Sequence, residues 1–237
     1  MSVKASFSVQ AKFQFYKDEE SFVVGWRDTA RSNVNHKTFL EGILLKSVDS
    51  PYPYVDYSVF YGGVKDIQGL TFQHVDNNHV NNVLRVQNHR YSTDIPPSRI
   101  TEQGCYDEIE CILRDNVKQL PRAPVSKDSV YFLSAFYSPE QTSSLEKLWK
   151  IWSGANFILW KCPSELNLRR ITFLKTTTNT DVFTYLILCE CEEGLNVINY
   201  AKEFLDRLKM RQCGLVGLYK VERYYIQPKE RMSLSSS

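Results

Sequence analysis

Several patterns that would identify a function directly are missing from this sequence. It contains no catalytic signature, and its six cysteines lack the paired CxxC spacing of a zinc site. No apolar run approaches the ~20 residues of a membrane-spanning helix. Residues 1–8 lack the basic start and apolar centre of a secretory signal. We therefore expect a protein of the cytosol or nucleus with reduced, mostly buried thiols, no membrane partner and no bound metal.

A strong charge of either sign is also missing. The net charge of +2 comes from 29 basic and 27 acidic residues, so no global field attracts nucleic acid or an anionic membrane. The 43% hydrophobic and 24% charged residues are typical of a globular protein. Because no internal repeat or low-complexity linker divides the chain, we expect one domain over 1–237, with a polar tail over 228–237.

Aromatic residues, by contrast, are abundant: 14 Tyr, 13 Phe and 4 Trp make 13% of the chain. A tyrosine ring is a rigid contact surface of low entropy cost, which suits protein contacts. Two groups of tyrosines are candidate contact sites; an interdigitated core is the open alternative. These are Tyr52, Tyr54, Tyr57 and Tyr61 in the first group and Tyr219, Tyr224 and Tyr225 in the second.

The clearest periodicity lies near the start of the chain. Apolar residues alternate with polar ones over 6–15, which predicts a strand with one buried face, and the apolar run 21–26 predicts a second strand. Further strands are expected over 54–61, 70–74, 83–87, 129–137, 155–161, 168–176, 182–191 and 214–226. Helices are expected over 36–47, 106–120, 138–154 and 195–210. The predicted fold class is α+β, mainly β, with an antiparallel sheet.

Candidate binding residues occur in four places, each with a simpler structural explanation. His74, His79 and His89 could bind metal or transfer protons, or could lie in turns. Cys189 and Cys191 could bind a soft metal, or could pack in the core. Arg169 and Arg170, beside Lys175 and several threonines, could contact phosphate or a nucleotide, or could simply be a polar strand end. Basic residues on the last helix could bind nucleic acid, or could favour the helix dipole. These are Lys202, Arg207, Lys209 and Arg211.

Several stretches resemble the cypovirus polyhedrins, the proteins that crystallise around virus particles inside infected insect cells. The similar pieces are FYKDEESFVVGW, HKTFLEGILLKS, YVDYSVFYGG, VLRVQN, VINYAKEFLDRLKM and VERYYIQP. The resemblance implies an antiparallel β-sandwich decorated with several helices. It also implies homotrimers packed into an intracellular crystal lattice, an occlusion body in the cytoplasm of the infected host cell that protects virus particles. Enzyme activity is not expected, nor is a cofactor, apart from a possible nucleotide at crystal contacts.

This resemblance gives the tyrosines a role. Tyrosine ionises near pH ~10, so clustered tyrosines at packed contacts would repel in a strongly alkaline gut and dissolve the crystal. The polar residues of the first strand would then meet neighbouring molecules: Ser6, Ser8, Gln10, Lys12 and Gln14. The alternative function is a nucleic-acid-binding or regulatory viral protein that uses Arg169, Arg170 and the basic last helix, although the charge makes nucleic acid an unfavoured partner. The third is an enzyme with a site around His74, His79 and His89.

Overall fold

The computed structural model describes residues 2–3, 9–62, 102–138, 143–177, 183–211 and 214–227. The strands are β1 (Ser2–Val3), β2 (Val9–Tyr16), β3 (Phe39–Asp49), β4 (Tyr54–Tyr61), β5 (Glu102–Leu113), β6 (Val130–Phe136), β7 (Leu168–Thr176), β8 (Tyr185–Cys191) and β9 (Leu215–Ile226). The helices are α1 (Glu19–Asn35), α4 (Ser143–Lys147), α5 (Trp149–Trp152), α6 (Ala155–Lys161) and α7 (Ile198–Lys209), with a short 3-10 helix, η2, over Ser164–Leu166.

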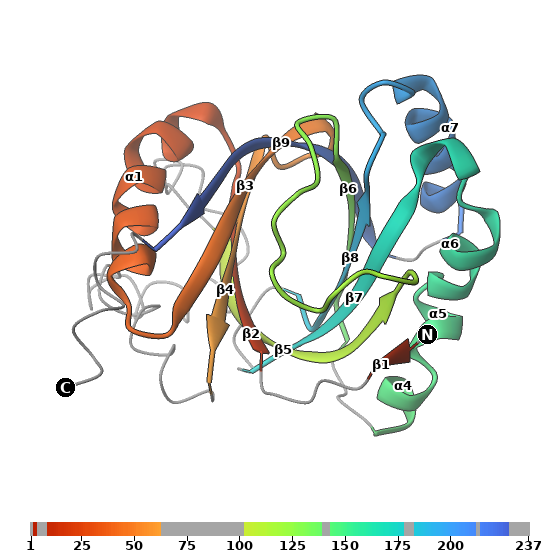
Figure 1. The fold of residues 1–237 in the computed structure, drawn as a ribbon, viewed down its shortest axis with the longest axis horizontal. Coiled ribbons are helices and arrows are strands. Elements are labelled where there is room, and N and C mark those ends of the chain that lie inside the picture. Colours follow the sequence, from red (N-terminus) through yellow and green to blue (C-terminus); the bar gives the residue numbers. More distant parts are fainter. Residues whose placement is uncertain are drawn as a thin grey trace, which may run out of the picture.

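Eight strands form a closed antiparallel barrel. Their order is β5-β2-β4-β3-β9-β6-β8-β7, and pairing of β7 with β5 closes the ring, while β1 pairs with β5 as an extra strand. Helix α1 covers one side of the barrel and α4 to α7 cover the opposite side (Figure 1). The expected β-sandwich is therefore wrong, because a sandwich keeps two separate sheets whereas here one sheet closes on itself.

The barrel consists of two similar halves. The first half contains β2, α1, β3, β4 and β5, with strand order β5-β2-β4-β3; the second contains β6 to β9, with order β9-β6-β8-β7. Across each half, the last strand in sequence lies next to the first, followed by the third and then the second. The second strand of each half pairs with the last strand of the other half, as β3 with β9 and β7 with β5. The fold thus contains a structural repeat that the sequence does not show.

Helix α1 begins and packs for reasons visible in its sequence. The Asp18 carboxylate accepts a hydrogen bond of 2.7 Å from the Ser21 N–H, which caps the first turn. Phe22 and Trp26, four residues apart, lie on the face that packs against Tyr16, Leu44 and Tyr54 of the sheet. The expected strand over 21–26 is therefore wrong, since these residues are the apolar face of a helix.

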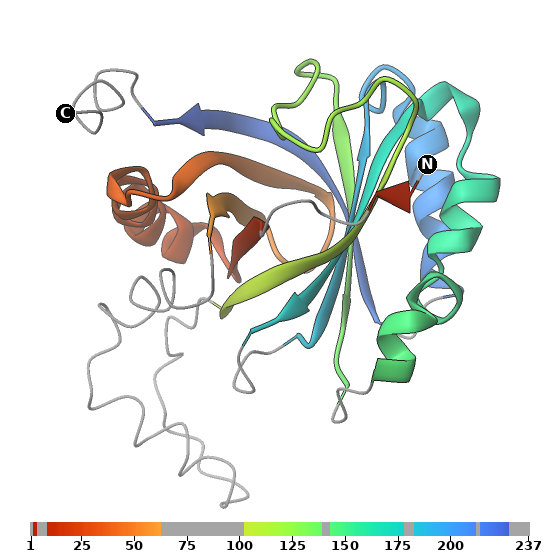
Figure 2. The ribbon, with the colours of Figure 1, turned by 60° about the horizontal axis from the view of Figure 1, so that its bottom comes forward.

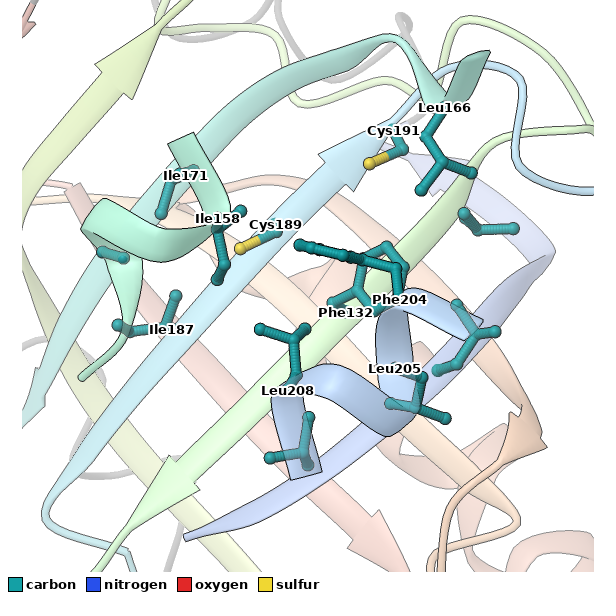
Figure 3. Close-up of a cluster of buried hydrophobic side chains, with 14 of the residues drawn as sticks. Phe132, Ile158, Leu166, Ile171, Ile187, Cys189, Cys191, Phe204, Leu205 and Leu208 are labelled. Atoms are coloured by element: carbon teal, nitrogen blue, oxygen red, sulfur yellow. The ribbon is translucent and has the colours of Figure 1, made fainter. Parts of the chain in front are cut away.

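The second half is covered by an apolar layer. Helices α6 and α7 lie over β6, β7 and β8, and their inward residues include Ile158, Phe204, Leu205 and Leu208 (Figure 3). The expected helix over 195–210 is confirmed by α7. The expected strand over 155–161 is wrong because these residues form α6, and the expected helix start at Ser138 adjoins residues 139–142, outside the described residues.

The barrel interior is filled by side chains from both halves. Its apolar part includes Phe13, Val59, Leu133, Leu186 and Tyr219. Strands such as β6 and β8 are buried at every residue, between this interior on one face and the helix layer on the other, so they show no simple alternation. The expected strands over 54–61, 129–137, 168–176 and 214–226 are confirmed, as is most of 182–191. The expected helices over 36–47 and 106–120 are wrong. Most of the first range belongs to β3, and the second belongs to β5 and to the segment that follows β5.

Segment 114–128 joins the two halves and lies across one end of the barrel (Figures 1 and 2). It carries Arg122, which is 1% exposed, into the interior.

No helix of the described residues is long and apolar enough to cross a membrane. The strands expected over 70–74 and 83–87, and the tail 228–237, lie outside the described residues.

Candidate functional site

A groove lies on the outside of the barrel, between α1 and β3 of the first half and β9 of the second. It encloses about 320 Å³, within the size range of small-molecule sites. We call it the α1 groove and define it by its lining residues, which are Phe22, Val23, Trp26, Arg27, Leu44, Glu222 and Arg223.

Stacked aromatic rings form the floor of the α1 groove. The rings of Phe22 and Tyr54 stack with centroids 3.8 Å apart, and those of Phe22 and Trp26 lie 5.8 Å apart with an angle of 29° between their planes. The Arg223 guanidinium lies over the Trp26 ring, 5.2 Å from its centroid. The floor thus combines mutually tilted aromatic rings with a cation that lies over one of them.

A buried carboxyl group stands behind this floor. Asp56, on β4, is 1% exposed. Its Oδ1 accepts hydrogen bonds from the Trp26 Nε1 at 3.3 Å and from the Tyr225 hydroxyl at 2.7 Å. Its Oδ2 accepts one from the Ser58 hydroxyl at 2.9 Å, and the Asn33 amide donates to Ser58 at 2.9 Å. Asp56 therefore links the groove floor to α1 and to β9.

Two buried groups on this face have pKa values displaced in opposite directions. Burial raises the pKa of the Asp56 carboxyl, although its hydrogen bonds and the charge of Lys12 act the other way. Burial lowers the pKa of the Lys12 ammonium, against the charges of Cys105 and Asp56. Burial thus disfavours the charged form of both groups, and a neighbouring acid and base with displaced pKa values are a candidate pair for proton transfer.

The matching face of the second half is different. There the helix-covered face of β6, β7 and β8 is apolar, with Phe132, Phe173 and Ile187 among its buried residues. On the first half, by contrast, the outward side chains of β2 and β4 are polar yet buried: Gln10 (1% exposed), Lys12 (4%), Gln14 (7%), Asp56 (1%) and Ser58 (0%). Such a departure from apolar packing in one of two equivalent places marks the first half as the candidate site.

A second polar cluster lies inside the barrel but encloses little space. Arg122 forms an ion pair with Glu108, and its Nη1 donates to the Thr172 hydroxyl at 3.2 Å. The cavity beside them measures about 10 Å³, which is about the space of one water. This cavity is therefore too small for a substrate.

The predicted tyrosine sites are mostly buried in the fold. Tyr57 and Tyr219 point into the barrel interior, and burial raises the pKa of both. Tyr224 donates to Glu41 at 2.9 Å and Tyr225 donates to Asp56. Tyr52 packs on Phe15, and Tyr54 lies under α1. Tyr61 is 55% exposed.

The predicted phosphate-binding arginines already have carboxylate partners. Arg169 contacts Glu190 at 2.9 Å, and Arg170, 3% exposed, contacts the same carboxylate at 3.5 Å. On α7, Arg207 pairs with Glu203 and Lys209 contacts Asp49 at 2.9 Å. Their roles as phosphate or nucleic-acid contacts stay predictions.

The predicted metal-binding residues are described only in part. His74, His79 and His89 lie outside the described residues, and Cys189 and Cys191 are buried in the apolar layer below α6 and α7. Within the described ranges, no group of three or more His, Cys, Asp or Glu side chains could hold a metal ion. The expected absence of a cofactor stays a prediction.

Sequence reasoning missed Asp56 and Trp26. A carboxylate in the middle of the strand YVDYSVFY, and a lysine within VQAKFQFY, were available signals, because charged residues are rarely buried without a reason. Lys12 was expected to face a neighbouring molecule, with Gln10 and Gln14; instead all three are covered within the chain.

Several known structures are similar to this chain, to different degrees. A crystal structure of an anthrone oxidase-like protein superposes with a TM-score of 0.57 at 11% identity, covering 100% of both chains. A monooxygenase-like protein from Listeria innocua gives 0.40 at 11% identity, over 94% of this chain and 95% of that one. Chlorite dismutase from Candidatus Nitrospira defluvii gives 0.37 at 11% identity, over 91% and 92%. No curated protein sequence matches the chain significantly.

These comparisons overturn the polyhedrin resemblance. A closed barrel shared with an anthrone oxidase-like protein replaces the sandwich, so a virus-occluding structural protein is wrong. The expectation of no enzyme activity is contradicted as well, and nothing supports the expected location in an occlusion body. The homotrimer, lattice and virus-particle partners rested on the same resemblance and stay untested predictions.

The family is shown by a match to the chain itself. A family model described as a domain of unknown function, DUF7153, matches residues 39–221, from the first residue of β3 into β9. This range contains most of both halves of the barrel and the Asp56 carboxyl. The chain therefore belongs to the DUF7153 family.

Proposed function

We propose that the chain is an enzyme that binds a planar aromatic small molecule in the α1 groove and oxidises it with molecular oxygen. The observation that carries this proposal is the groove, whose floor is made by the stacked rings of Phe22 and Trp26. Flat aromatic rings provide a large apolar contact area for another flat ring. A space of about 320 Å³ accommodates a small ligand of this kind.

The charges at the groove favour a ligand that carries acidic oxygen substituents. Arg27 and Arg223 contribute two guanidinium groups, against the one carboxylate of Glu222. Guanidinium groups form strong hydrogen bonds with phenolate and carboxylate oxygens. We therefore expect a phenolic or carboxylated polycyclic compound to bind more tightly than its uncharged parent.

The oxidation itself is supported by the shared fold and by the buried acid and base behind the groove. A CH₂ group next to aromatic rings would become a ketone: the carbon loses two hydrogens and gains one oxygen atom, and the other oxygen atom of O₂ leaves as water. Asp56 contacts the floor through Trp26 and is assigned as a positioning residue. The name of the anthrone oxidase-like protein suggests anthrone, a tricyclic aromatic ketone with such a CH₂ group, as the probe.

The test combines binding with turnover. Oxygen uptake and quinone formation are measured with anthrone, and binding is measured with anthraquinone-2-sulfonate as a soluble, anionic probe. Trp26→Ala should abolish probe binding and uptake, because it removes the floor of the groove. Trp160→Ala is the matched control, since Trp160 is 81% exposed on α6 of the other half.

The outcomes separate the two parts of the proposal. Probe binding that is lost in Trp26→Ala, without enzyme-dependent oxygen uptake, would retain the ligand site but exclude the oxidation of anthrone. Probe binding that is equal in both variants would exclude the α1 groove as the site.

A further inference from the structure

Three cysteines converge on the helix-covered side of the second half. Cys189 and Cys191 point outward from β8 into the layer formed with Ile158 of α6 and Leu166 of η2 (Figure 3). Cys162 directly follows α6 as its C-terminal capping residue, and it packs against the same layer. Its thiol forms a hydrogen bond with that of Cys191. Residues distant in sequence therefore place two sulfur atoms side by side.

The three thiols differ in their access to solvent. Cys189 and Cys191 are both 0% exposed, and free cysteines of this kind usually act as small apolar core residues. Cys162 is only partly buried. Its position at the end of a helix, followed by Pro163, leaves it at the rim of the layer. An oxidant that arrives from solvent therefore meets Cys162 first.

Reactivity also differs between these thiols. Burial raises the pKa of Cys189, and the hydrogen bond with Cys162 together with burial raises the pKa of Cys191. Cys191 is also 0% exposed, so peroxide from solvent does not reach its sulfur directly. Cys191 is thus protected from direct oxidation, yet lies where it can react with an oxidised Cys162.

We propose that Cys162 and Cys191 are a redox-modification site, in which hydrogen peroxide oxidises Cys162 and Cys191 then closes a reversible disulfide. In the first step the Cys162 sulfur takes one oxygen atom from peroxide, which gives a sulfenic acid and releases one water. In the second step the Cys191 sulfur attacks the Cys162 sulfur. The sulfenic oxygen leaves as a second water with the thiol proton of Cys191.

The electron count balances. The two thiols together lose two electrons and two protons, and one peroxide molecule is reduced to two water molecules. A dithiol reductant reverses the change by thiol–disulfide exchange. The new bond would tie the end of α6 to the end of β8, so the oxidised protein should unfold at a higher temperature than the reduced protein.

The test uses the full chain in its folded state. The protein is treated with a small molar excess of hydrogen peroxide, alkylated under denaturing conditions and digested, and linked peptides are identified by mass spectrometry. We expect a peptide pair joined through Cys162 and Cys191, lost on reduction and accompanied by a rise in Tm. Cys162→Ser should remove the link and the Tm shift, whereas Cys105→Ser, in the first half, should leave both unchanged.

Three results would overturn the proposal. The first is a link from Cys162 to Cys189 in place of Cys191. The second is oxidation of Cys162 to sulfinic acid without a link. The third is a peroxide-dependent Tm shift that persists in Cys162→Ser. Because Cys162 is partly exposed, Cys162→Ser should fold, and a circular dichroism spectrum equal to that of the parent confirms this.

Discussion

The Asp56 carboxyl is buried in the middle of a strand and still receives hydrogen bonds from three side chains, those of Trp26, Ser58 and Tyr225. Burying a charge costs free energy unless partners compensate for the lost water. Here compensation is incomplete, since burial raises the pKa of this group despite its partners. A group that lowers stability in this way, yet orients the floor of a groove, fits a functional role better than a structural one.

Asp56→Asn should change how stability depends on pH. A carboxyl whose pKa is raised in the folded state binds more protons folded than unfolded, so its ionisation lowers the free energy of unfolding as pH rises. The window opens near the ordinary aspartate pKa of about 4 and extends up to the raised value. The stability of Asp56→Asn relative to the parent should therefore increase across this window, measured by urea unfolding at several pH values.

The matched control is Asp28→Asn, an exposed aspartate on α1. It should follow the parent at every pH. A stability difference between Asp56→Asn and the parent that is constant with pH would show that the buried carboxyl does not titrate as the structure implies.

Two glycines provide a second residue-scale prediction. A Cβ at Gly42 would lie 2.1 Å from the Tyr225 ring, whose hydroxyl is held by Asp56. Gly42→Ala should therefore lower the free energy of unfolding by about 1–3 kcal/mol and weaken probe binding. A Cβ at Gly25, within α1, meets Tyr16 at an ordinary 3.5 Å, so Gly25→Ala should raise stability by about 0.5–1 kcal/mol. Equal effects in urea unfolding would contradict this account.

Among the elements, segment 114–128 is the one that ties the two halves together. Its Arg122 pairs with Glu108 of β5 and donates to Thr172 of β7. The Arg122 backbone N–H donates to Glu41 of β3 at 2.6 Å, and Glu41 accepts from Tyr224 of β9. Arg122 thus contacts both pairs of strands through which the halves are joined, β3 with β9 and β5 with β7.

Arg122→Met should therefore destabilise the protein by about 3–5 kcal/mol, because it leaves the Glu108 carboxylate buried without its cation. Adding Glu108→Gln to this variant should recover part of the loss. Arg207→Met serves as the control, since the ion pair of Arg207 with Glu203 is exposed. A loss in Arg122→Met no larger than in the control would show that the segment does not hold the barrel closed.

The element scale is also where sequence reasoning succeeded and failed. β2, with Phe13 and Phe15 alternating with Lys12 and Gln14, was predicted because its two faces differ in polarity. β3 was mistaken for a helix because both of its faces are buried, so apolar residues follow no period of two. In β5, a bulge between Glu108 and Glu110 shifts the alternation and mimics helical spacing. Closure of the barrel depends on pairings across more than fifty residues, which local patterns do not encode.

For the whole molecule, the two halves share one interior core. Phe13 and Val59 of the first half pack in the same cluster as Leu133 and Leu186 of the second. A core shared in this way couples the stability of both halves, so we expect a single cooperative unfolding transition.

This cooperativity is measurable with two probes. In Trp26→Phe the remaining tryptophans, Trp149, Trp152 and Trp160, all lie in the second half, whereas far-ultraviolet circular dichroism reports both halves. The two urea transitions should have the same midpoint. Separate midpoints would show that the halves fold as independent units.

The central claim, that the α1 groove is a site for planar aromatic compounds, is tested most directly by a crystal structure of the protein with anthraquinone-2-sulfonate. The account predicts the rings against the face of Trp26, with the sulfonate beside Arg27 or Arg223. A ligand bound elsewhere on the protein, with the α1 groove empty at saturating probe, would contradict it.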